Sequence, residues 1–243
     1  MHGAVGSQPH RQLVQIIVKL SYEIRRRYLT AHARGSMWCK ICGISNLADA
    51  KDAADAGVDA IGLNFYSESP RCVSTATAKA LSSAINEYAP NVVRVGLFVN
   101  HSESEVRAVL AEVPLDMLQF HGTEPAEFCA FFDMPFIKVL SMRPDIDFLT
   151  LEKQYASAWG LLLDTYHPTQ AGGTGETFDW HLWPHGSATK LILAGGLTPD
   201  NVAGAISHTQ PYGVDVSGGV EGGVKGKKQQ QLVRRFIEEA KNV

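Results

Sequence analysis

Two stretches near the C-terminus, Leu191-Ile-Leu-Ala-Gly-Gly196 and Val214-Asp-Val-Ser-Gly-Gly219, decide the fold class. Each is a short apolar run that ends in glycines, and each is followed by a segment with helical spacing of its apolar residues. Glycines at such a junction open backbone N–H groups at the start of a helix, which is a common way to bind a phosphate. Two such stretches late in a strand–helix repeat predict a barrel whose last two loops bind a phosphorylated small molecule.

The same alternation of apolar runs and amphipathic segments extends back to Met37. The amphipathic segments have apolar residues every three or four positions, which is typical of helices with one buried face. The predicted strands are 38–43, 60–66, 92–100, 117–122, 136–142, 160–166, 190–196 and 213–219, and the predicted helices include 47–56, 75–88, 103–112, 125–132, 199–206 and 227–241. Uniformly apolar strands joined by helices indicate a parallel sheet covered by helices. About eight such units favour a single (β/α)8 TIM barrel over an open doubly wound sheet, which usually has fewer strands.

Length and charge narrow the class of protein further. The chain of 243 residues is long enough for one large barrel. Its formal net charge of −3 does not indicate binding to nucleic acid or to a membrane surface. No apolar run reaches the roughly 18 residues that a membrane span needs. A chain of this size with four cysteines does not need disulfides, which predicts the cytoplasm.

Residues 1–36 differ in composition from the rest of the chain. They are rich in Lys and Arg and contain a single acidic residue, Glu23, so that they resemble a basic leader. The pair Gly35-Ser36 looks like cloning sequence. We expect residues 1–36 to be an extension without fixed structure, from a start codon assigned too early or from cloning, and residues 37–243 to form the catalytic barrel.

Polar side chains gather where the predicted strands end. Barrels of this kind carry their chemistry at the carboxyl ends of the strands, and buried charges there are costly unless they have a use. The residues in question are Lys40, Cys42, Asn64, Gln119, His121, Asp164, Asp215 and Ser217.

Cys39 and Cys42 match the C-x-x-C pattern of metal and redox sites. Residues three apart on a strand face opposite sides, so these two thiols should neither share a metal ion nor form a disulfide. No second pair of Cys or His follows at ligand spacing, and we expect no metal site. Cys42 shares the face of Lys40, where it is either a small buried hydrophobe or a thiolate made available by Lys40 or other cations.

The other candidates also have two interpretations each. Asp164 ends a strand of leucines and is either a general acid or a cap for nearby N–H groups, and Asp215 has the same ambiguity. Arg71 lies in the loop after the second strand, where it is either solvated or binds a carboxylate through its guanidinium fork. Considered alone, His121 is better explained as a histidine with a structural role than as a site residue.

Two further features carry less information. His101, His181 and His185 have no partner pattern, and we interpret them as surface residues. The glycines of Gly172-Gly-Thr-Gly175 suit a mobile lid, although an ordinary surface loop has the same composition.

Taken together, the motifs resemble the phosphoribosylanthranilate isomerase family of tryptophan biosynthesis. The matching segments occur in family order from Met37 to the C-terminus. They are Lys40-Ile-Cys-Gly-Ile44, Ser69-Pro-Arg71, Gln119-Phe-His-Gly122, Leu162-Leu-Asp-Thr165, Gly172-Gly-Thr-Gly-Glu-Thr-Phe-Asp-Trp180, Ala194-Gly-Gly-Leu197 and Asp215-Val-Ser-Gly-Gly-Val-Glu221. The departures are Cys72, where an aromatic residue is commoner, and Gly218, where a second serine is frequent.

The resemblance implies an Amadori rearrangement. In that reaction, N-(5-phosphoribosyl)anthranilate becomes 1-(2-carboxyphenylamino)-1-deoxyribulose 5-phosphate without a metal or an organic cofactor. By position, the resemblance implies that Cys42 is the general base and Asp164 the general acid.

The resemblance also implies how the substrate is held. Arg71 would bind the anthranilate carboxylate, Asp215 a sugar hydroxyl or the anthranilate nitrogen, and Gln119 and His121 would add further substrate contacts. The phosphate would lie on the backbone near Gly195, Gly196, Ser217 and Gly218. The expected partner is a small phosphorylated substrate, and the protein would be a monomer or a homodimer.

Two other functions remain open at this point. Another phosphate-binding barrel, such as an indole-glycerol-phosphate synthase or a thiamin-phosphate synthase-like transferase, should show lysine–glutamate pairs or metal-binding carboxylates, but Glu is sparse at the strand ends. A barrel that only binds a phosphorylated ligand or a partner protein would not need Cys42 or Asp164. Activity on a related aminoaldose of histidine synthesis would need a second phosphate site, and none is evident after the early strands.

Overall fold

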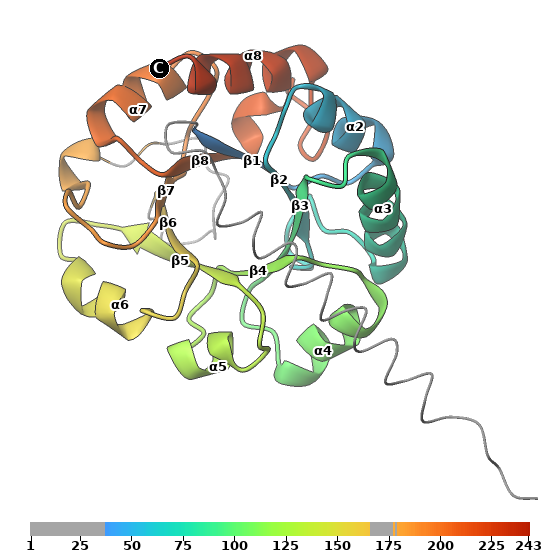
Figure 1. Cartoon of the computed structure of the whole chain (residues 1–243), viewed down its shortest axis with the longest axis horizontal. Coiled ribbons are helices and arrows are strands. Elements are labelled where there is room, and N and C mark those ends of the chain that lie inside the picture. Colours follow the sequence, from blue (N-terminus) through green and yellow to red (C-terminus); the bar gives the residue numbers. More distant parts are fainter. Residues whose placement is uncertain (1–36, 166–176, 178) are drawn as a thin grey trace, which may run out of the picture. The chain divides into compact units, whose positions relative to one another are not determined.

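The eight predicted strands form a closed parallel barrel in chain order, with helices on the outside (Figure 1). The computed structural model describes residues 37–165, 177 and 179–243, and residues 37–243 belong to one compact unit. The strands are β1 (Trp38–Cys42), β2 (Ala60–Asn64), β3 (Val93–Phe98), β4 (Met117–Phe120), β5 (Phe136–Met142), β6 (Gly160–Thr165), β7 (Leu191–Leu193) and β8 (Gly213–Val216). The prediction of a (β/α)8 barrel is therefore confirmed.

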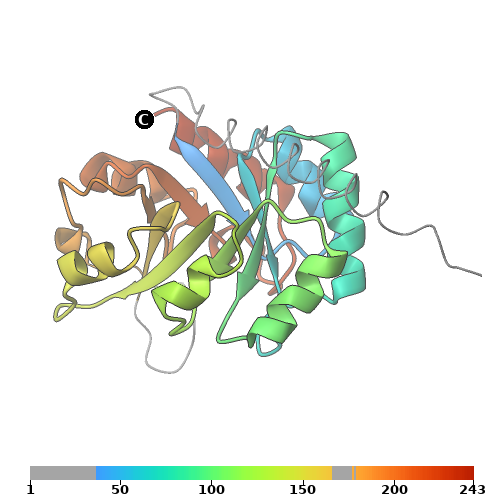
Figure 2. The ribbon, with the colours of Figure 1, turned by 60° about the horizontal axis from the view of Figure 1, so that its bottom comes forward.

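The helices pack around the strands and alternate with them along the chain (Figure 2). They are α2 (Leu47–Asp55), α3 (Thr75–Tyr88), α4 (Glu103–Glu112), α5 (Ala126–Ala130), α6 (Phe148–Gln154), α7 (Val202–Thr209) and α8 (Gln230–Lys241), with short 3-10 helices η1 (Trp180–Leu182) and η2 (Gly218–Val220). Between β6 and β7, the described residues contain η1 but no α-helix. None of the helices in the described ranges is long and apolar enough to cross a membrane.

Helix starts follow the local sequence closely. The side chains of Asn46, Ser74 and Ser102 each accept a hydrogen bond from a backbone N–H in the first turn of α2, α3 and α4. At α4, Glu105 returns a hydrogen bond to the N–H of Ser102 and completes a capping box. These caps explain why the sequence predicts the starts of these three helices correctly.

The last two strands are shorter than predicted. β7 ends at Leu193 rather than at residue 196, and β8 ends at Val216 rather than at residue 219. Gly195 and Gly196 have φ of +85° and +60°, values that take the chain out of strand conformation. The helix predicted at 227–241 begins only at Gln230, because Gly226 has φ of +83° and Lys228 is buried in the preceding loop.

Closure of the barrel brings the first and last strands side by side. Lys40 is paired in register with Asp215 across β1 and β8, and Cys42 with Gly62 across β1 and β2. On β1, Cys39 and Ile41 belong to the apolar layer between strands and helices. Lys40 and Cys42 therefore face the interior of the barrel, as the alternation of side chains on a strand requires.

Two predicted features lie outside the described residues. They are the extension, residues 1–36, and the glycine segment Gly172–Gly175.

Candidate active site

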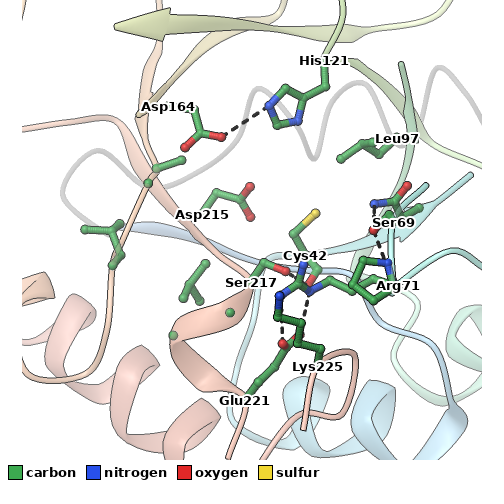
Figure 3. Close-up of a pocket in the computed structure, with 18 of the residues that line it drawn as sticks. Cys42, Ser69, Arg71, Leu97, His121, Asp164, Asp215, Ser217, Glu221 and Lys225 are labelled. Carbon is green, nitrogen blue, oxygen red and sulfur yellow. Dashed lines mark hydrogen bonds and ion pairs between the residues drawn. The ribbon is translucent and has the colours of Figure 1, made fainter. Parts of the chain in front are cut away.

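A cavity of about 690 Å³ lies at the carboxyl ends of the strands (Figure 3). It brings together residues from both ends of the chain, including every site residue that the sequence analysis proposed. Those residues are Cys42, Arg71, Gln119, His121, Asp164, Gly195, Gly196, Asp215, Ser217 and Gly218.

The two cysteines of the C-x-x-C pattern face opposite sides of β1, as predicted. The thiol of Cys42 lines the cavity and points into it (Figure 3), whereas Cys39 is buried in the apolar layer and its Sγ lies 3.7 Å from the Met37 carbonyl oxygen. Space for the Cys42 thiol exists because its neighbour on β2 is Gly62. A Cβ at Gly62 would lie 2.9 Å from the Cys42 Sγ. No group of three Cys, His, Asp or Glu side chains in the described residues could hold a metal ion.

Lys40 does not supply an unpaired positive charge to Cys42. Its Nζ donates to both carboxylate oxygens of Asp215, each at 3.0 Å, and the side chain is fully buried. Burial lowers the pKa of Lys40, but the contact with Asp215 outweighs this effect, so that the pKa is raised and the amine stays charged.

The thiol of Cys42 is consequently less acidic than the sequence suggested. Burial raises its pKa, the charge of Lys40 opposes the rise, Asp215 adds to it, and Lys228 opposes it. The balance is a pKa above the ordinary value. The thiolate interpretation of Cys42 stays a prediction, because burial and Asp215 raise the pKa of the thiol while Lys40 and Lys228 favour its charged form.

Asp164 lies one residue before the end of β6 and lines the cavity in a fixed orientation. Its Oδ1 accepts from the N–H of Thr165 at 2.8 Å, and its Oδ2 lies 3.3 Å from the Nε2 of His121. A Cβ at Gly195 would come within 2.9 Å of this Oδ1, so glycine there keeps the space beside the carboxyl group. Asp164 thus fits both predicted interpretations, since it receives a local N–H and also lines the cavity.

A buried ion pair behind the cavity holds the loop that carries His121. Lys138 Nζ contacts Glu124 Oε2 at 2.8 Å and donates to the carbonyl of Gly122 at 2.6 Å. Glu124 in turn accepts from the N–H groups of Gly122 and Asn100 at 2.9 and 2.7 Å. The imidazole of His121 is therefore positioned by a rigid loop rather than by a mobile one.

Gln119 on β4 has an unpaired polar atom at the cavity. Its side chain is 1% exposed, and Oε1 has no hydrogen-bond partner among the described residues. A buried acceptor left without a partner costs about 1–3 kcal/mol, so this carbonyl group is suited to a donor on a ligand.

The glycine-ended loops after β7 and β8 form one rim of the cavity. In the described part of the chain, the N–H groups of Gly195, Gly196 and Gly218 have no hydrogen-bond acceptor. A Cβ at Gly219 would collide with the Leu197 carbonyl oxygen, so the two loops approach each other closely. The short 3-10 helix η2 lies in the loop after β8. Backbone N–H groups at such a rim are suited to a phosphate.

Ser217 takes part in this rim through its backbone. Its hydroxyl donates to the carbonyl oxygen of Cys42 at 3.1 Å, which ties the β8 loop to the end of β1. A hydroxyl has one hydrogen to donate, so that hydrogen is already used within the protein.

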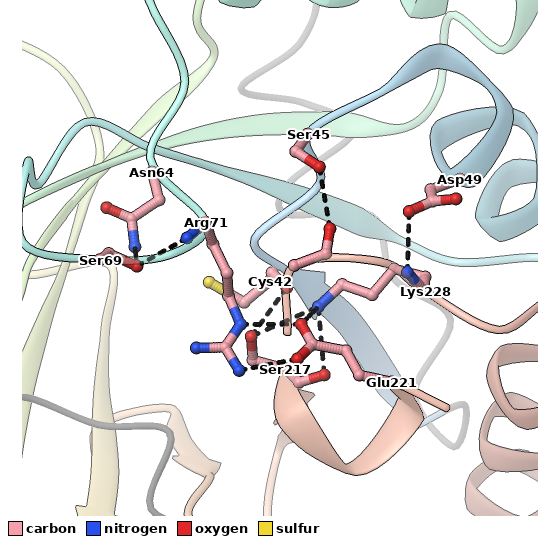
Figure 4. Close-up of polar contacts among 10 residues, drawn as sticks. Cys42, Ser45, Asp49, Asn64, Ser69, Arg71, Ser217, Glu221 and Lys228 are labelled. Carbon is pink, nitrogen blue, oxygen red and sulfur yellow. Dashed lines mark hydrogen bonds and ion pairs between the residues drawn. The ribbon is translucent and has the colours of Figure 1, made fainter. Parts of the chain in front are cut away.

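Arg71 has a partner that the sequence analysis did not assign. Its Nε and Nη2 donate to Glu221 at 2.7 and 2.9 Å, and Lys228 contacts the same carboxylate at 2.8 Å (Figure 4). Glu221 ends the last matching motif, which is the signal that could have identified it. Its pairing with Arg71 across 150 residues could not be read from spacing.

Asn64 and His101 hold loops at the mouth. Asn64 Nδ2 donates to Ser69 Oγ at 3.1 Å, and its Oδ1 accepts from the N–H of Tyr66. His101 was predicted to be a surface residue, but it is half-buried. Its Nδ1 accepts from the N–H of Val99 at 3.2 Å, and its ring packs edge-on against Phe98. His181 and His185 are exposed, as predicted.

Comparison with known proteins points to one family. Residues 39–239 match the family model of N-(5'phosphoribosyl)anthranilate (PRA) isomerase. The chain is 50% identical over 202 residues to N-(5'-phosphoribosyl)anthranilate isomerase of Cellvibrio japonicus, which covers 83% of this chain and 92% of that protein.

Solved structures agree with the sequence comparison. Phosphoribosyl anthranilate isomerase from Thermotoga maritima superimposes with a TM-score of 0.77 at 38% identity, covering 85% of this chain and 100% of that one. A structure of phosphoribosyl anthranilate isomerase in complex with reduced 1-(o-carboxyphenylamino)-1-deoxyribulose 5-phosphate has a TM-score of 0.71 at 35% identity, with the same coverage of 85% and 100%.

Proposed function

Because this chain belongs to the N-(5'-phosphoribosyl)anthranilate isomerase family, we propose that it performs an Amadori rearrangement with Cys42 as general base and Asp164 as general acid. The activity of the chain is isomerisation of N-(5'-phosphoribosyl)anthranilate in tryptophan biosynthesis. The observation that carries the assignment of roles is that the Cys42 thiol and the Asp164 carboxyl group line one cavity, beside the two glycine-ended loops.

The substrate is proposed to lie across the cavity with its phosphate at the β7–β8 rim. There the backbone N–H groups near Gly195, Gly196, Ser217 and Gly218 bind the phosphate oxygens. Arg71 receives the anthranilate carboxylate. A related isomerase has been solved with a phosphorylated, carboxyphenyl-bearing ligand, which supports a site with these two anion-binding ends.

Asp164 acts first in the proposed sequence. Its carboxyl group gives a proton to the furanose ring oxygen, the bond between C1 and that oxygen breaks, and the nitrogen lone pair forms a protonated imine. Thr165 and His121 support this step because they fix the direction of the carboxyl group. General acid catalysis of this kind contributes about 10² to 10⁴ in rate.

Cys42 acts second. Its thiolate takes the proton from C2, and the electron pair of that bond forms C1=C2 and neutralises the imine. The resulting enolamine gains a proton at C1 and loses one from the C2 hydroxyl, which gives the ketone. The protonated imine is a cation beside the thiol, and a nearby cation stabilises the thiolate against the effect of burial.

Asp215 and Lys40 are proposed to hold the reacting end of the sugar. Asp215 lines the cavity and contacts a sugar hydroxyl or the anthranilate nitrogen, while the bidentate contact from Lys40 fixes its carboxylate. Gln119 and His121 contribute further substrate contacts. Every step is a proton transfer between groups of the protein and the substrate, so the proposed reaction needs no metal or organic cofactor.

The proposed mechanism also leads to expectations about oligomeric state, cellular location and partners. All the proposed residues belong to one chain, so activity is expected from a monomer or from a homodimer. The cytoplasm is the proposed location because the catalytic thiol must stay reduced. The partner is the small phosphorylated substrate, with no role for nucleic acid or a membrane.

The test replaces the acid and the base one at a time. Cys42→Ser and Asp164→Asn should each lower kcat by at least about a hundredfold, because each removes one proton-transfer group. The midpoint temperature of thermal unfolding, Tm, should stay within a few degrees of that of the parent protein. Turnover within a few-fold of the parent in either variant would remove that residue from the mechanism. If both variants were fully active, the cavity would serve binding only.

A further inference from the structure

The side chain of Arg71 is held along its whole length. Its backbone N–H donates to Ser69 Oγ at 3.2 Å, and Asn64 fixes that hydroxyl from the other side. Gly43, with φ of +75°, packs its backbone on the stem so closely that a Cβ there would come 2.5 Å from Arg71 Cδ. This close packing restricts the conformations of the Arg71 methylene groups.

The head group of Arg71 is fixed by Glu221 along one edge. The two oxygens of Glu221 take the Nε and Nη2 hydrogens, and both side chains are less than 10% exposed. A guanidinium carries five N–H bonds in a rigid plane, so two of them on one edge leave the Nη1–Nη2 edge available. Glu221 is the only acceptor of the Arg71 guanidinium among residues 37–165 and 179–243.

Lys228 keeps Glu221 charged and in place. Its Nζ lies 2.8 Å from Glu221 Oε1 and also donates to the carbonyl of Ser217 at 3.1 Å (Figure 4). Burial raises the pKa of Glu221, but the hydrogen bond from Arg71 and the charge of Lys228 outweigh it, and the pKa lies below its ordinary value. Burial lowers the pKa of Lys228 and Glu221 opposes this effect; with Lys228 protonated, the three side chains carry one net positive charge, which one substrate carboxylate neutralises.

We propose that Glu221 is a positioning residue for substrate recognition, which presents the Nη1–Nη2 edge of Arg71 to the anthranilate carboxylate. The inference rests on the proposed role of Arg71. In this proposal Glu221 acts through Arg71 and not by contact with the substrate. Its contribution is that binding of the substrate carboxylate does not have to order a long, flexible side chain, because the rotamer freedom of Arg71 is already lost in the free protein.

The test separates recognition of the carboxylate from the chemical step. Glu221→Gln removes the charge, and Glu221→Asp keeps the charge for Lys228 but shortens the reach to Arg71. Both should raise KM about tenfold or more while kcat stays within about threefold, because an interaction with the bound substrate is lost equally in the ground state and the transition state. Competitive inhibition by inorganic phosphate, which has no carboxylate, should be unchanged in both variants.

A double substitution then ties the effect to Arg71. In an Arg71→Met background, which should itself raise KM, Glu221→Gln should add no further increase, since a positioning effect disappears with the group it positions. Unchanged or lower KM in Glu221→Gln would overturn the inference, because Glu221 would then be neutral or a competitor of the substrate. Parallel loss of kcat and of phosphate inhibition would also overturn it, in favour of a general role in holding the rim.

Failure of the underlying assignment gives a different result. If Arg71→Met leaves KM unchanged, the proposed role of Arg71 falls and the role of Glu221 falls with it. If Arg71→Met raises KM and the two Glu221 variants do not, the role of Arg71 stands and this inference alone is overturned.

Discussion

Cys39 and Cys42 lie on the same strand, three residues apart, and yet have different surroundings. Cys39 is buried among apolar side chains, and burial together with Asp59 raises its pKa to about 12. Cys42 is also buried and its pKa is also raised, but Lys40 and Lys228 oppose the rise, and its thiol faces the cavity. Burial and a nearby cation are thus shared by both residues, since Lys241 opposes the rise at Cys39, and what distinguishes Cys42 is the face of the strand and the cavity that this face lines.

The comparison shows how a barrel assigns chemistry to a strand. Alternate residues of β1 face the helices or the barrel interior, so the register of the strand decides which of the two cysteines lines the cavity. The C-x-x-C pattern is therefore no metal or redox motif in this setting. It is one packing residue and one proposed base.

The largest expected effect concerns alkylation of the two thiols. In a Cys72→Ser background, which removes the exposed cysteine, inactivation by iodoacetamide should accelerate about tenfold per pH unit, or about hundredfold from pH 7 to pH 9. A raised pKa means that the reactive thiolate is scarce at neutral pH and grows with pH up to and beyond the ordinary thiol value of 9.0.

Mass spectrometry of the alkylated protein supplies the control. Cys42 should carry the label and Cys39 should stay unmodified. A Cys42→Ser variant should not be labelled by iodoacetamide at the rate measured for the parent protein. A rate that levels off below pH 8 would contradict the raised pKa of Cys42, and equal labelling of Cys39 would remove the distinction between the two faces.

The next effect concerns the space beside Cys42. Gly62→Ala places a Cβ where it would lie 2.9 Å from the Cys42 Sγ, so the thiol must move. We expect kcat to fall about tenfold or more, because displacement of a reacting group by about an ångström is costly. Gly204→Ala in α7 is the matched control, since a Cβ there meets nothing within 4 Å. Equal kcat in the two variants would show that the thiol position is not critical.

A smaller effect is expected from Cys39. Cys39→Ser buries a hydroxyl group in an apolar layer, which should lower the free energy of unfolding by about 1–3 kcal/mol. Urea denaturation measures this loss, and kcat of the folded fraction should stay at the parent value. A large fall in kcat without loss of stability would mean that the outer face of β1 also contributes to the chemistry.

The smallest effect is expected from removal of residues 1–36. The family match begins at residue 39 and β1 begins at Trp38, so kcat/KM should stay within about twofold and β1 should keep its two cysteine environments. Assays of the protein that starts at Met37 measure this. Aggregation of the shortened protein would show that the extension contributes to stability.

Much of the fold was readable from the sequence because its rules are local. Apolar runs located all eight strands, and the spacing of apolar residues located helices such as α4, whose start the side chain of Ser102 caps. The strand ends were less accurate where glycines at positive φ, such as Gly195, follow directly on apolar residues. The spacing of apolar residues along the sequence does not show where the backbone leaves the extended conformation.

The residues that line the site could be predicted from the sequence, but the ion pairs between them could not. Strand-end position sufficed to gather Cys42, Asp164 and Asp215 in one cavity. It did not reveal that Asp215 would neutralise Lys40, or that Glu221 would occupy one edge of Arg71. Both depend on distances between side chains from opposite ends of the chain, which only the closed barrel defines.

The rim after β7 and β8 has a consequence for how new activities arise on this scaffold. The groups proposed to bind the phosphate there are main-chain amides, which most point substitutions leave intact. If the proposal holds, substitutions at the ends of β1 and β6 can change the reaction while the main-chain site for the phosphate is retained. Only substitution of the glycines themselves would disrupt this main-chain site.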